Sequence, residues 1–322
     1  MARGDLRNRL RRSVEHFLGT VQEPWYTWLN ALANALILIR NPERVMHPGT
    51  LNPEKTFYVL HDFPKHVGLA GWYDGVLGYV MWAIGKGWIP VAKAPPPALE
   101  DGGGWDDFFS IVGSPPVDEV MASRNVVYAV TRGMIHKRYS RSSVAKRHPI
   151  CEMVRPSDRL LKFLDERLPP LFEGAPEPMV AVRFRGTDYR YAHAHAKVPD
   201  MDYFCGVVEA DMRKWGVPTV GGEHILFVTE DQSAFDAFRR RFPRCRFVEK
   251  ERIATFKRGV SICLQHLPTL SPLMNDFMYI LEIYAMSKCD YLIGGVNGGV
   301  LMALNLNGNR YKGVHVLNTG VN

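Results

Sequence analysis

Charged and polar side chains follow a short apolar run near the middle of the 322-residue chain. Residues 179–182 are apolar, and Arg183, Arg185, Asp188 and His193 come soon after them. A guanidinium is planar and permanently charged, so paired arginines suit a phosphate or a diphosphate. Histidine has an unperturbed pKa of about 6.5 and can accept a proton at neutral pH. This segment therefore carries groups for anion binding and for general base catalysis.

Two further polar clusters follow apolar runs later in the chain, at 229–231 and at a glycine-rich turn near 294–299. Their candidate binding residues are Thr229, Glu230, Asp231, Asn297, Gly298 and Gly299. Backbone N–H groups at a helix start, aided by the helix dipole, bind phosphate. All three polar clusters also have a purely structural interpretation. Arg185 and Asp188 could form an ion pair, residues 229–231 could be a helix N-cap, and residues 294–299 could be a tight turn. Their joint occurrence at three strand ends favours a nucleotide site.

The second half of the chain alternates strand and helix patterns, which predicts a parallel, doubly wound sheet. Strands are predicted at 179–184, 224–231, 246–250, 290–295 and 313–317, with helices at 201–216, 232–243, 275–289 and 299–308. Ligands of such sheets bind beyond the carboxyl ends of the strands. We therefore expect the three polar clusters to share one cleft.

The first half predicts a smaller unit of the same α/β class. Strands are predicted at 55–63, 88–93 and 125–130, with helices at 68–88 and at 157–168, the latter capped by Ser157. We expect a helical N-terminal segment over 1–45, a Rossmann-like domain over 46–172 and a second Rossmann-like domain over 173–322. The apolar segment 25–39 is shorter than the roughly 20 residues that a membrane span needs.

Composition narrows the class of protein. The five cysteines form no CxxC pair, so neither a zinc site nor a disulfide framework is predicted, and a reducing cytoplasm is expected. The formal net charge is +7, and no acidic residue lies between Glu119 and Glu152. That basic stretch is either a solvated loop or a surface that faces phosphates or anionic lipid. Nucleic-acid binding has only the net charge in its favour, and GxGxxG and GxxxxGK[ST] motifs are absent.

Three segments together resemble the donor-site motifs of the α-1,6- and protein O-fucosyltransferase superfamily. They are VRFRGTDY (182–189), ILFVTEDQSAFDAFRRRFP (225–243) and YILEIYAMSKCDYLIGGVNGGV (279–300). The superfamily includes core-fucosylating enzymes and the nodulation fucosyltransferases of rhizobia, and the resemblance covers about residues 50 to 318. It implies a GT-B fold with two Rossmann-like domains facing across a cleft, GDP-fucose as donor, inversion of the anomeric centre, and no metal.

The resemblance also implies roles for individual residues. Arg185 takes the position of the arginine that binds the β-phosphate, and Arg183 stands where the family has a histidine. Asp188 takes the position of the motif aspartate, and we expect it to be catalytic together with Arg185 and His193. Glu230 and Asp231 would lie near the nucleoside, and Glu282 would receive the guanine N–H groups. Asn297, Gly298 and Gly299 replace a serine-rich phosphate turn. His193, with His195 two residues later, stands where core-fucosylating members carry a catalytic carboxylate. Both histidines could instead be loop residues.

These expectations define an inverting, metal-independent glycosyltransferase of bacterial polysaccharide biosynthesis. It would transfer fucose from a GDP-sugar to a surface glycan or a lipid-linked oligosaccharide. The protein would be cytoplasmic, with peripheral contact to the anionic inner face of the membrane, and would need no cofactor, metal or nucleic acid. The alternative is a catalytically inactive GDP- or glycan-binding protein of the same fold.

Overall fold

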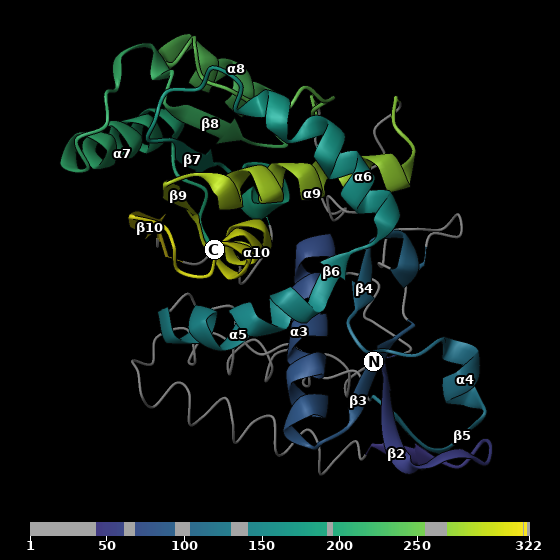
Figure 1. The fold of residues 1–322 in the computed structure, drawn as a ribbon. Helices are drawn as coiled ribbons and strands as arrows, with labels where there is room; N and C mark the ends of the chain where they lie inside the picture. Colours follow the sequence, from purple (N-terminus) through teal and green to yellow (C-terminus); the bar gives the residue numbers. More distant parts are fainter. Residues whose placement is uncertain are drawn as a thin grey trace, which may run out of the picture.

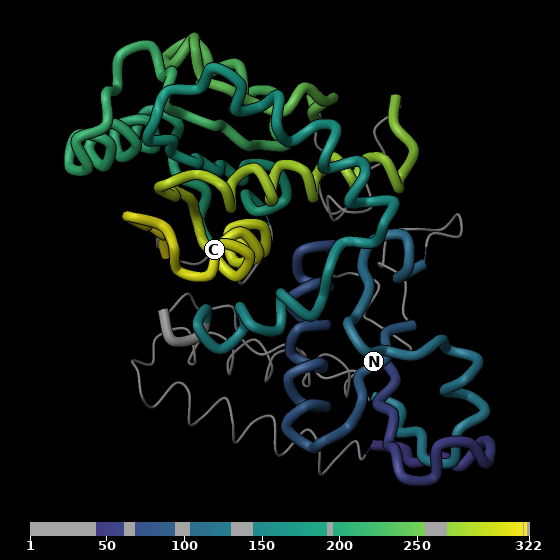
Figure 2. Tube along the Cα trace, viewed as in Figure 1, coloured from purple at the N-terminus to yellow at the C-terminus, as the bar shows by residue number. Residues whose placement is uncertain are grey.

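The computed structural model describes residues 43–60, 68–93, 104–129, 141–191, 196–254, 269–317 and 319–320, and it omits the side chains of 141–143. The predicted N-terminal helices, most of the basic stretch before residue 141, His193 and His195 lie outside these residues. Figure 1 shows the elements, and Figure 2 shows the same view as a tube.

The first sheet has the strand order β1-β5-β2-β3. Its strands are β1 (Arg44–Met46), β2 (Leu51–Leu60), β3 (Ile89–Ala92) and β5 (Ser123–Tyr128). β2 runs parallel to both of its neighbours, and β1 is antiparallel to β5. Helix α3 (Leu69–Gly85) connects β2 to β3, as the sequence predicts. This βαβ unit confirms an α/β arrangement in the first half of the chain.

The second sheet is parallel throughout and has the order β10-β9-β7-β8. Its strands are β7 (Val180–Arg183), β8 (Ile225–Val228), β9 (Tyr291–Gly295) and β10 (Gly313–Leu317). The helices between them are α7 (Met201–Lys214), α8 (Gln232–Arg241), α9 (Pro272–Lys288) and α10 (Gly298–Asn307). Every residue of β7 and β8 is buried, which is typical of a parallel sheet covered on both faces. The predicted α/β class is thus confirmed.

Residues 246–250, predicted to be a strand, form only an isolated parallel bridge between Arg246 and Leu226. A second isolated parallel bridge follows between Ile253 and Asp231, and between the two bridges a side chain bonds to the carbonyl groups of the segment. The Arg252 guanidinium donates to the carbonyl oxygens of Val248 (3.0 Å) and Lys250 (3.1 Å). A carbonyl bonded in this way does not need a neighbouring strand, so the strand prediction is wrong here.

Helix α5 (Arg141–Met153) and several short elements were not predicted from the sequence. β4 (Phe109–Ile111) and β6 (Val154–Pro156) form an antiparallel ribbon. The others are α4 (Val117–Met121) and the 3-10 turns η1 (Trp105–Asp107), η2 (Pro169–Leu171), η3 (Asp188–Arg190) and η4 (Val220–Gly222). Helix α6 (Asp158–Arg167) was predicted, and its N-cap Ser157 accepts a hydrogen bond from the Leu160 N–H at 3.1 Å.

One hydrophobic core joins the two sheets. Its buried residues include Tyr58 and Trp72 from the first half and Ala181, Leu226 and Leu292 from the second. Helix α10 packs against both α3 and α5, and the segment from α5 to α6 runs from one half to the other (Figures 1 and 2). The carboxyl edge of the second sheet is therefore supported by a packed interior.

Among the described helices, none has the length and apolar character to cross a bilayer.

Candidate functional site

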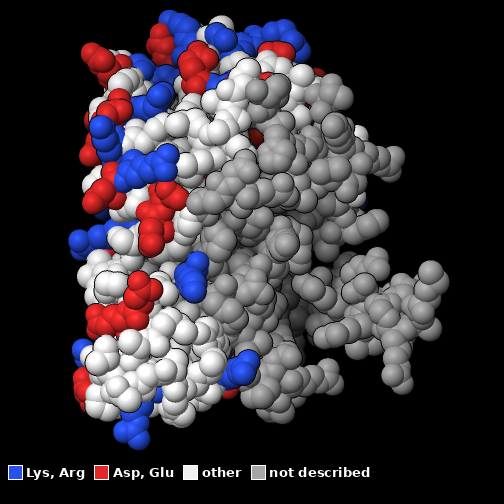
Figure 3. All heavy atoms as spheres, turned by 90° about the vertical axis from the view of Figure 1, so that its right-hand side faces the viewer, with Lys and Arg blue, Asp and Glu red and all other residues white. Residues whose placement is uncertain are grey.

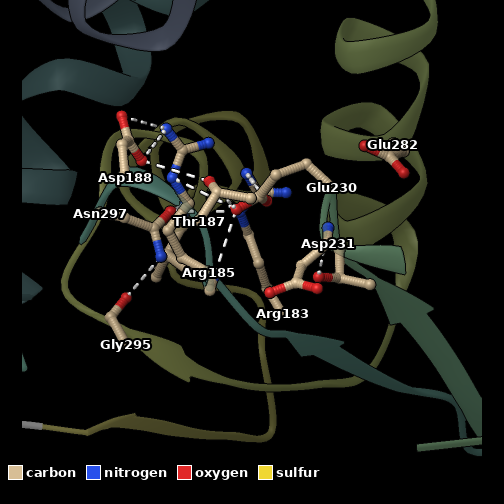
Figure 4. Close-up of polar contacts among 12 residues, drawn as sticks. Arg183, Arg185, Thr187, Asp188, Glu230, Asp231, Glu282, Gly295 and Asn297 are labelled. Atoms are coloured by element: carbon tan, nitrogen blue, oxygen red, sulfur yellow. Dashed lines mark hydrogen bonds and ion pairs between the residues drawn. The ribbon is translucent and has the colours of Figure 1, made fainter. Parts of the chain in front are cut away.

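The carboxyl ends of β7, β8 and β9 bring the predicted polar clusters together. Arg183, the last residue of β7, pairs in register with Val228 on one side and Gly294 on the other. Glu230 follows β8, and Asn297 lies between β9 and α10. Figure 4 shows their side chains converging with those of Arg185, Thr187 and Asp188. The sequence-based expectation that these clusters meet is correct.

Arg183 lies at the bottom of this site and is only 1% exposed. Its Nε donates to Asn297 Oδ1 at 3.2 Å, and its guanidinium lies 5.2 Å from the centre of the Tyr279 ring. Nη2 is 4.0 Å from Glu230 Oε2. The buried Nη1 has no hydrogen-bond partner among the described atoms. This side chain thus keeps one donor group that is unpaired within the described structure.

Arg185 is held by two carboxylates. Its Nη2 lies 3.0 Å from Asp188 Oδ1, and its Nε lies 3.5 Å from Glu230 Oε1. Glu230 Oε1 also accepts from the Gly186 N–H at 3.2 Å and from the Thr187 hydroxyl at 3.0 Å. The Arg185–Asp188 ion pair that the sequence allowed is therefore present, and it is part of a larger network.

Opposite charges set the protonation of this network. Burial opposes the charge of Arg185, but Glu230 and Asp188 outweigh it and raise the Arg185 pKa above its ordinary value. Burial likewise opposes the charge of Glu230, but Arg185 and Arg183 outweigh it and lower the Glu230 pKa. Glu230 is therefore a permanent carboxylate near neutral pH. It fixes the arginines and is poorly suited to accept a proton.

The start of α10 forms another wall of the site. Asn297 is the N-cap: its Oδ1 accepts from the Val300 N–H at 3.1 Å, and its amide donates to the Gly295 carbonyl at 2.9 Å. A Cβ on Gly299 would lie 2.8 Å from Arg183 Nε and 3.0 Å from the Tyr279 hydroxyl. Glycine therefore allows the helix start to approach the buried arginine closely.

A pocket opens beyond these groups, between the ends of β7, β9 and β10. Its polar lining comprises Arg183, Arg185, Tyr189, Lys197, Asn297 and Thr319. Apolar residues form the rest of the wall, among them Phe184, Val198, Pro199, Phe204 and Leu317. The pocket thus brings together a helix start, two arginines and a lysine, which are groups of the kind that bind anions.

The other predicted residues of the second cluster serve the local fold. Asp231 is the N-cap of α8, and its Oδ1 accepts from the Ala234 N–H at 3.1 Å. The Thr229 hydroxyl accepts from the Asp231 N–H at 3.2 Å. The helix N-cap interpretation of this segment is thus correct. Contact of Thr229 or Asp231 with a nucleoside stays a prediction.

Glu282 lies apart from the arginines, on α9 (Figure 4). It is 1% exposed, and its Oε2 accepts from Lys250 Nζ at 2.7 Å. Its Oε1 is buried and has no partner among the described atoms. Recognition of guanine by this carboxylate stays a prediction, as does the catalytic role of His193, which lies outside the described residues.

Sequence reasoning missed Tyr279 and Lys197. Tyr279 lies one helical turn before Glu282 on α9, and burial raises its pKa, so its hydroxyl stays protonated beside Arg183. Lys197 follows the segment of the two histidines by two residues. Tyr279 is the first residue of the segment 279–300 that resembles a donor-site motif, but no role was expected for it, and no strand end or motif marked Lys197.

No metal centre can be assembled from the described residues, which contain no group of three His, Cys, Asp or Glu side chains in suitable positions. Asp200 and Asp202 form a DxD sequence at the start of α7, where Asp200 is the N-cap and accepts from the Asp202 N–H at 2.8 Å.

On the face shown in Figure 3, positive and negative side chains lie next to one another among the described atoms.

No protein-family model and no curated protein matches the sequence. The fold is similar to fucosyltransferase NodZ from Bradyrhizobium, with a TM-score of 0.49 and 11% identity over 77% of this chain and 92% of that chain. For NodZ alpha-1,6-fucosyltransferase soaked with GDP-fucose, the TM-score is 0.47 and the identity 12%, over 77% of this chain and 91% of that chain. For POFUT1 in complex with GDP, the TM-score is 0.37 and the identity 10%, over 83% of this chain and 76% of that chain. These neighbours belong to the superfamily that the three sequence segments resemble. At this identity and overlap the likeness concerns the fold alone.

Proposed function

We propose that this protein is an inverting, metal-independent glycosyltransferase that moves a sugar, fucose, from a GDP-sugar to a hydroxyl of a surface glycan or lipid-linked oligosaccharide. One observation carries the proposal: Arg183, Arg185 and the start of α10 meet around a pocket at the carboxyl edge of a parallel sheet. Both arginines and the glycine turn come from segments that resemble donor-site motifs.

The geometry supports a diphosphate in this pocket. The Arg183 Nη1 is buried without a partner, and an unpaired buried donor typically costs about 1–3 kcal/mol. A phosphate oxygen there would satisfy it and would also face the positive end of the α10 dipole. Arg185 has a raised pKa and stays charged throughout the neutral range. The site thus offers fixed positive charge that needs no rearrangement of protons.

The proposed reaction follows from where charge develops. The acceptor hydroxyl attacks the anomeric carbon, and the electron pair of the breaking C–O bond moves to the leaving GDP. Arg185 and Arg183 would stabilise that leaving diphosphate, and loss of one preorganised donor typically costs about 10²–10³ in rate. A base must take the acceptor proton, and we assign this role to His193. Asp188 and Glu230 serve instead as the partners of Arg185.

The test is calorimetric titration of the full chain with GDP, GDP-fucose, GDP-mannose and UDP-glucose in the absence of metal. We expect selective binding of the guanine nucleotides, with Arg185→Ala weakening GDP binding at least tenfold. Arg240→Ala, an exposed arginine on α8, is the matched control and should bind as the wild type does. Failure of the wild type to bind any of these nucleotides would refute the proposed donor site.

A binding protein without catalytic activity is the second candidate. Arg183 favours it, because a buried and permanently charged side chain stands where the resembling family has a histidine. Turnover of GDP-fucose with GDP release, measured beside binding, separates the two candidates: binding with no release in the presence of glycan acceptors supports the binding protein. A cytoplasmic location with contact to anionic lipid completes the proposal, and a liposome flotation assay tests that contact.

A further inference from the structure

The charges around the arginine pocket cancel unless one further residue is counted. Arg183 and Arg185 contribute two positive charges, and Glu230 and Asp188, which pair with them, contribute two negative charges. A diphosphate that enters such a site would meet no net attraction from these four groups. Among the other residues that line the pocket in the described part of the chain, Lys197 is the one with a positive charge.

Lys197 differs from the arginines in its surroundings. Its side chain is exposed at the mouth of the pocket. No carboxylate of the described residues lies within ion-pair distance of its ammonium group. Its charge is therefore uncompensated within the described structure. An ammonium group also imposes no planar geometry and has a flexible stem, so it can follow a phosphate group that moves.

The backbone of Lys197 is held in place from the far end of the chain. Its N–H donates to the carbonyl oxygen of Gly320 at 3.0 Å, and its own carbonyl oxygen accepts from the Thr319 hydroxyl. Thr319 itself lines the pocket. The residues that follow β10 thus fix where the Lys197 side chain begins, and they keep that side chain at the pocket.

We propose that Lys197 binds the terminal phosphate of the nucleoside diphosphate and supplies the net positive charge of the site. The inference rests on the proposed function, since it names a further ligand of the same donor. Arg183 and Arg185, fixed by carboxylates, give the site its shape, whereas Lys197 gives it the charge that attracts the donor. After the C–O bond breaks, the same ammonium group stays with the leaving diphosphate and balances its new charge.

The experiment compares GDP with guanosine monophosphate in calorimetric titrations of the full chain. Lys197→Gln should weaken GDP binding about tenfold and guanosine monophosphate binding less, because the monophosphate lacks the terminal group. Lys197→Arg should retain GDP affinity within a few-fold. Lys214→Gln, an exposed lysine at the end of α7, is the matched control and should bind like the wild type. The salt dependence of GDP binding should also decrease in Lys197→Gln.

Thr319→Val gives an independent readout, since it removes the hydroxyl that holds the Lys197 backbone and keeps the lysine. A loss of GDP affinity smaller than that of Lys197→Gln supports the proposed positioning. Unchanged GDP binding in Lys197→Gln would overturn the role of Lys197 while leaving the donor site intact. An equal loss for both nucleotides would overturn the assignment to the terminal phosphate. Absence of GDP binding in the wild type would instead overturn the proposed function, and this inference with it.

Discussion

Gly299→Ala tests the close packing between the start of α10 and the buried arginine. The new Cβ would lie 2.8 Å from Arg183 Nε, 3.0 Å from its Cζ and 3.0 Å from the Tyr279 hydroxyl, whereas ordinary contacts begin at 3.4 Å. The neighbours must therefore yield by roughly half an ångström. Arg183 cannot do so freely, because it is 1% exposed and the same Nε donates to Asn297.

The expected magnitude is the balance of three effects. Overpacking of a buried site typically costs about 1–3 kcal/mol, and a lost hydrogen bond to a charged group costs about 1.5–3 kcal/mol. Alanine regains up to about 1 kcal/mol of helix propensity over glycine. We expect Gly299→Ala to lower the free energy of unfolding by roughly 2–5 kcal/mol and to weaken GDP binding, because Arg183 and the helix start are displaced.

Gly206→Ala on α7 is the matched control. A Cβ at this helical glycine would meet nothing within 4 Å, so the substitution should stabilise the protein by roughly 0.5–1 kcal/mol. Urea unfolding of both variants measures the difference. Arg183→His shortens the opposing side chain and should make Gly299→Ala less costly, with a coupling free energy of about 1 kcal/mol or more in a double-mutant cycle. Equal effects of the two glycine substitutions, or strict additivity in the cycle, would refute the packing argument.

Three further predictions concern groups outside the pocket that are wholly or partly removed from solvent. Desolvation raises the pKa of Asp276 on α9 from 3.8 to about 7, so the free energy of unfolding should fall as the pH rises from about 4 to 7. Asp276→Asn should therefore raise the unfolding temperature at pH 8 and leave it unchanged at pH 4. An equal effect at both pH values would contradict the raised pKa. Lys250→Met removes one partner of the buried Lys250–Glu282 ion pair and should lower the free energy of unfolding, measured in urea, by about 3–5 kcal/mol. The double variant Lys250→Met/Glu282→Gln should recover most of that free energy, whereas additive losses from the two substitutions would argue against the pair. Burial raises the pKa of the Cys151 thiol to about 12, so an alkylating reagent at pH 8 should modify Cys151 only after the protein is denatured. Peptide mass spectrometry measures this modification, and rapid labelling of the native protein would contradict the burial of Cys151.

The periodicity of the sequence predicted most elements of the second half and several of the first. The strand at 180–183 and the helix capped by Ser157 are set by local patterns, namely a short buried apolar run and a side-chain oxygen before an amphipathic segment. Parallel connectivity then requires the ends of β7, β8 and β9 to share one edge, so the meeting of Arg183, Glu230 and Asn297 could be predicted without coordinates.

The tertiary structure decided which of these residues interact and how. Arg183 and Asn297 are separated by 114 positions in the sequence, and no local pattern indicates that the Arg183 Nε donates to the cap of α10. Burial of Glu282 against Lys250 depends likewise on a contact between distant segments. At 246–250, where a strand was predicted, the Arg252 side chain bonds to the carbonyl oxygens of Val248 and Lys250, and the sequence pattern did not indicate this contact.

The sequence by itself determined the α/β class, the order of the elements and the charged edge of the second sheet, because these depend on residue type and spacing along the chain. The balance of charge in the pocket, the need for glycine at position 299 and the placement of Lys197 by Thr319 were decided only by the tertiary structure. These properties depend on distances between groups far apart in the sequence, and such distances are fixed only when the whole chain has packed.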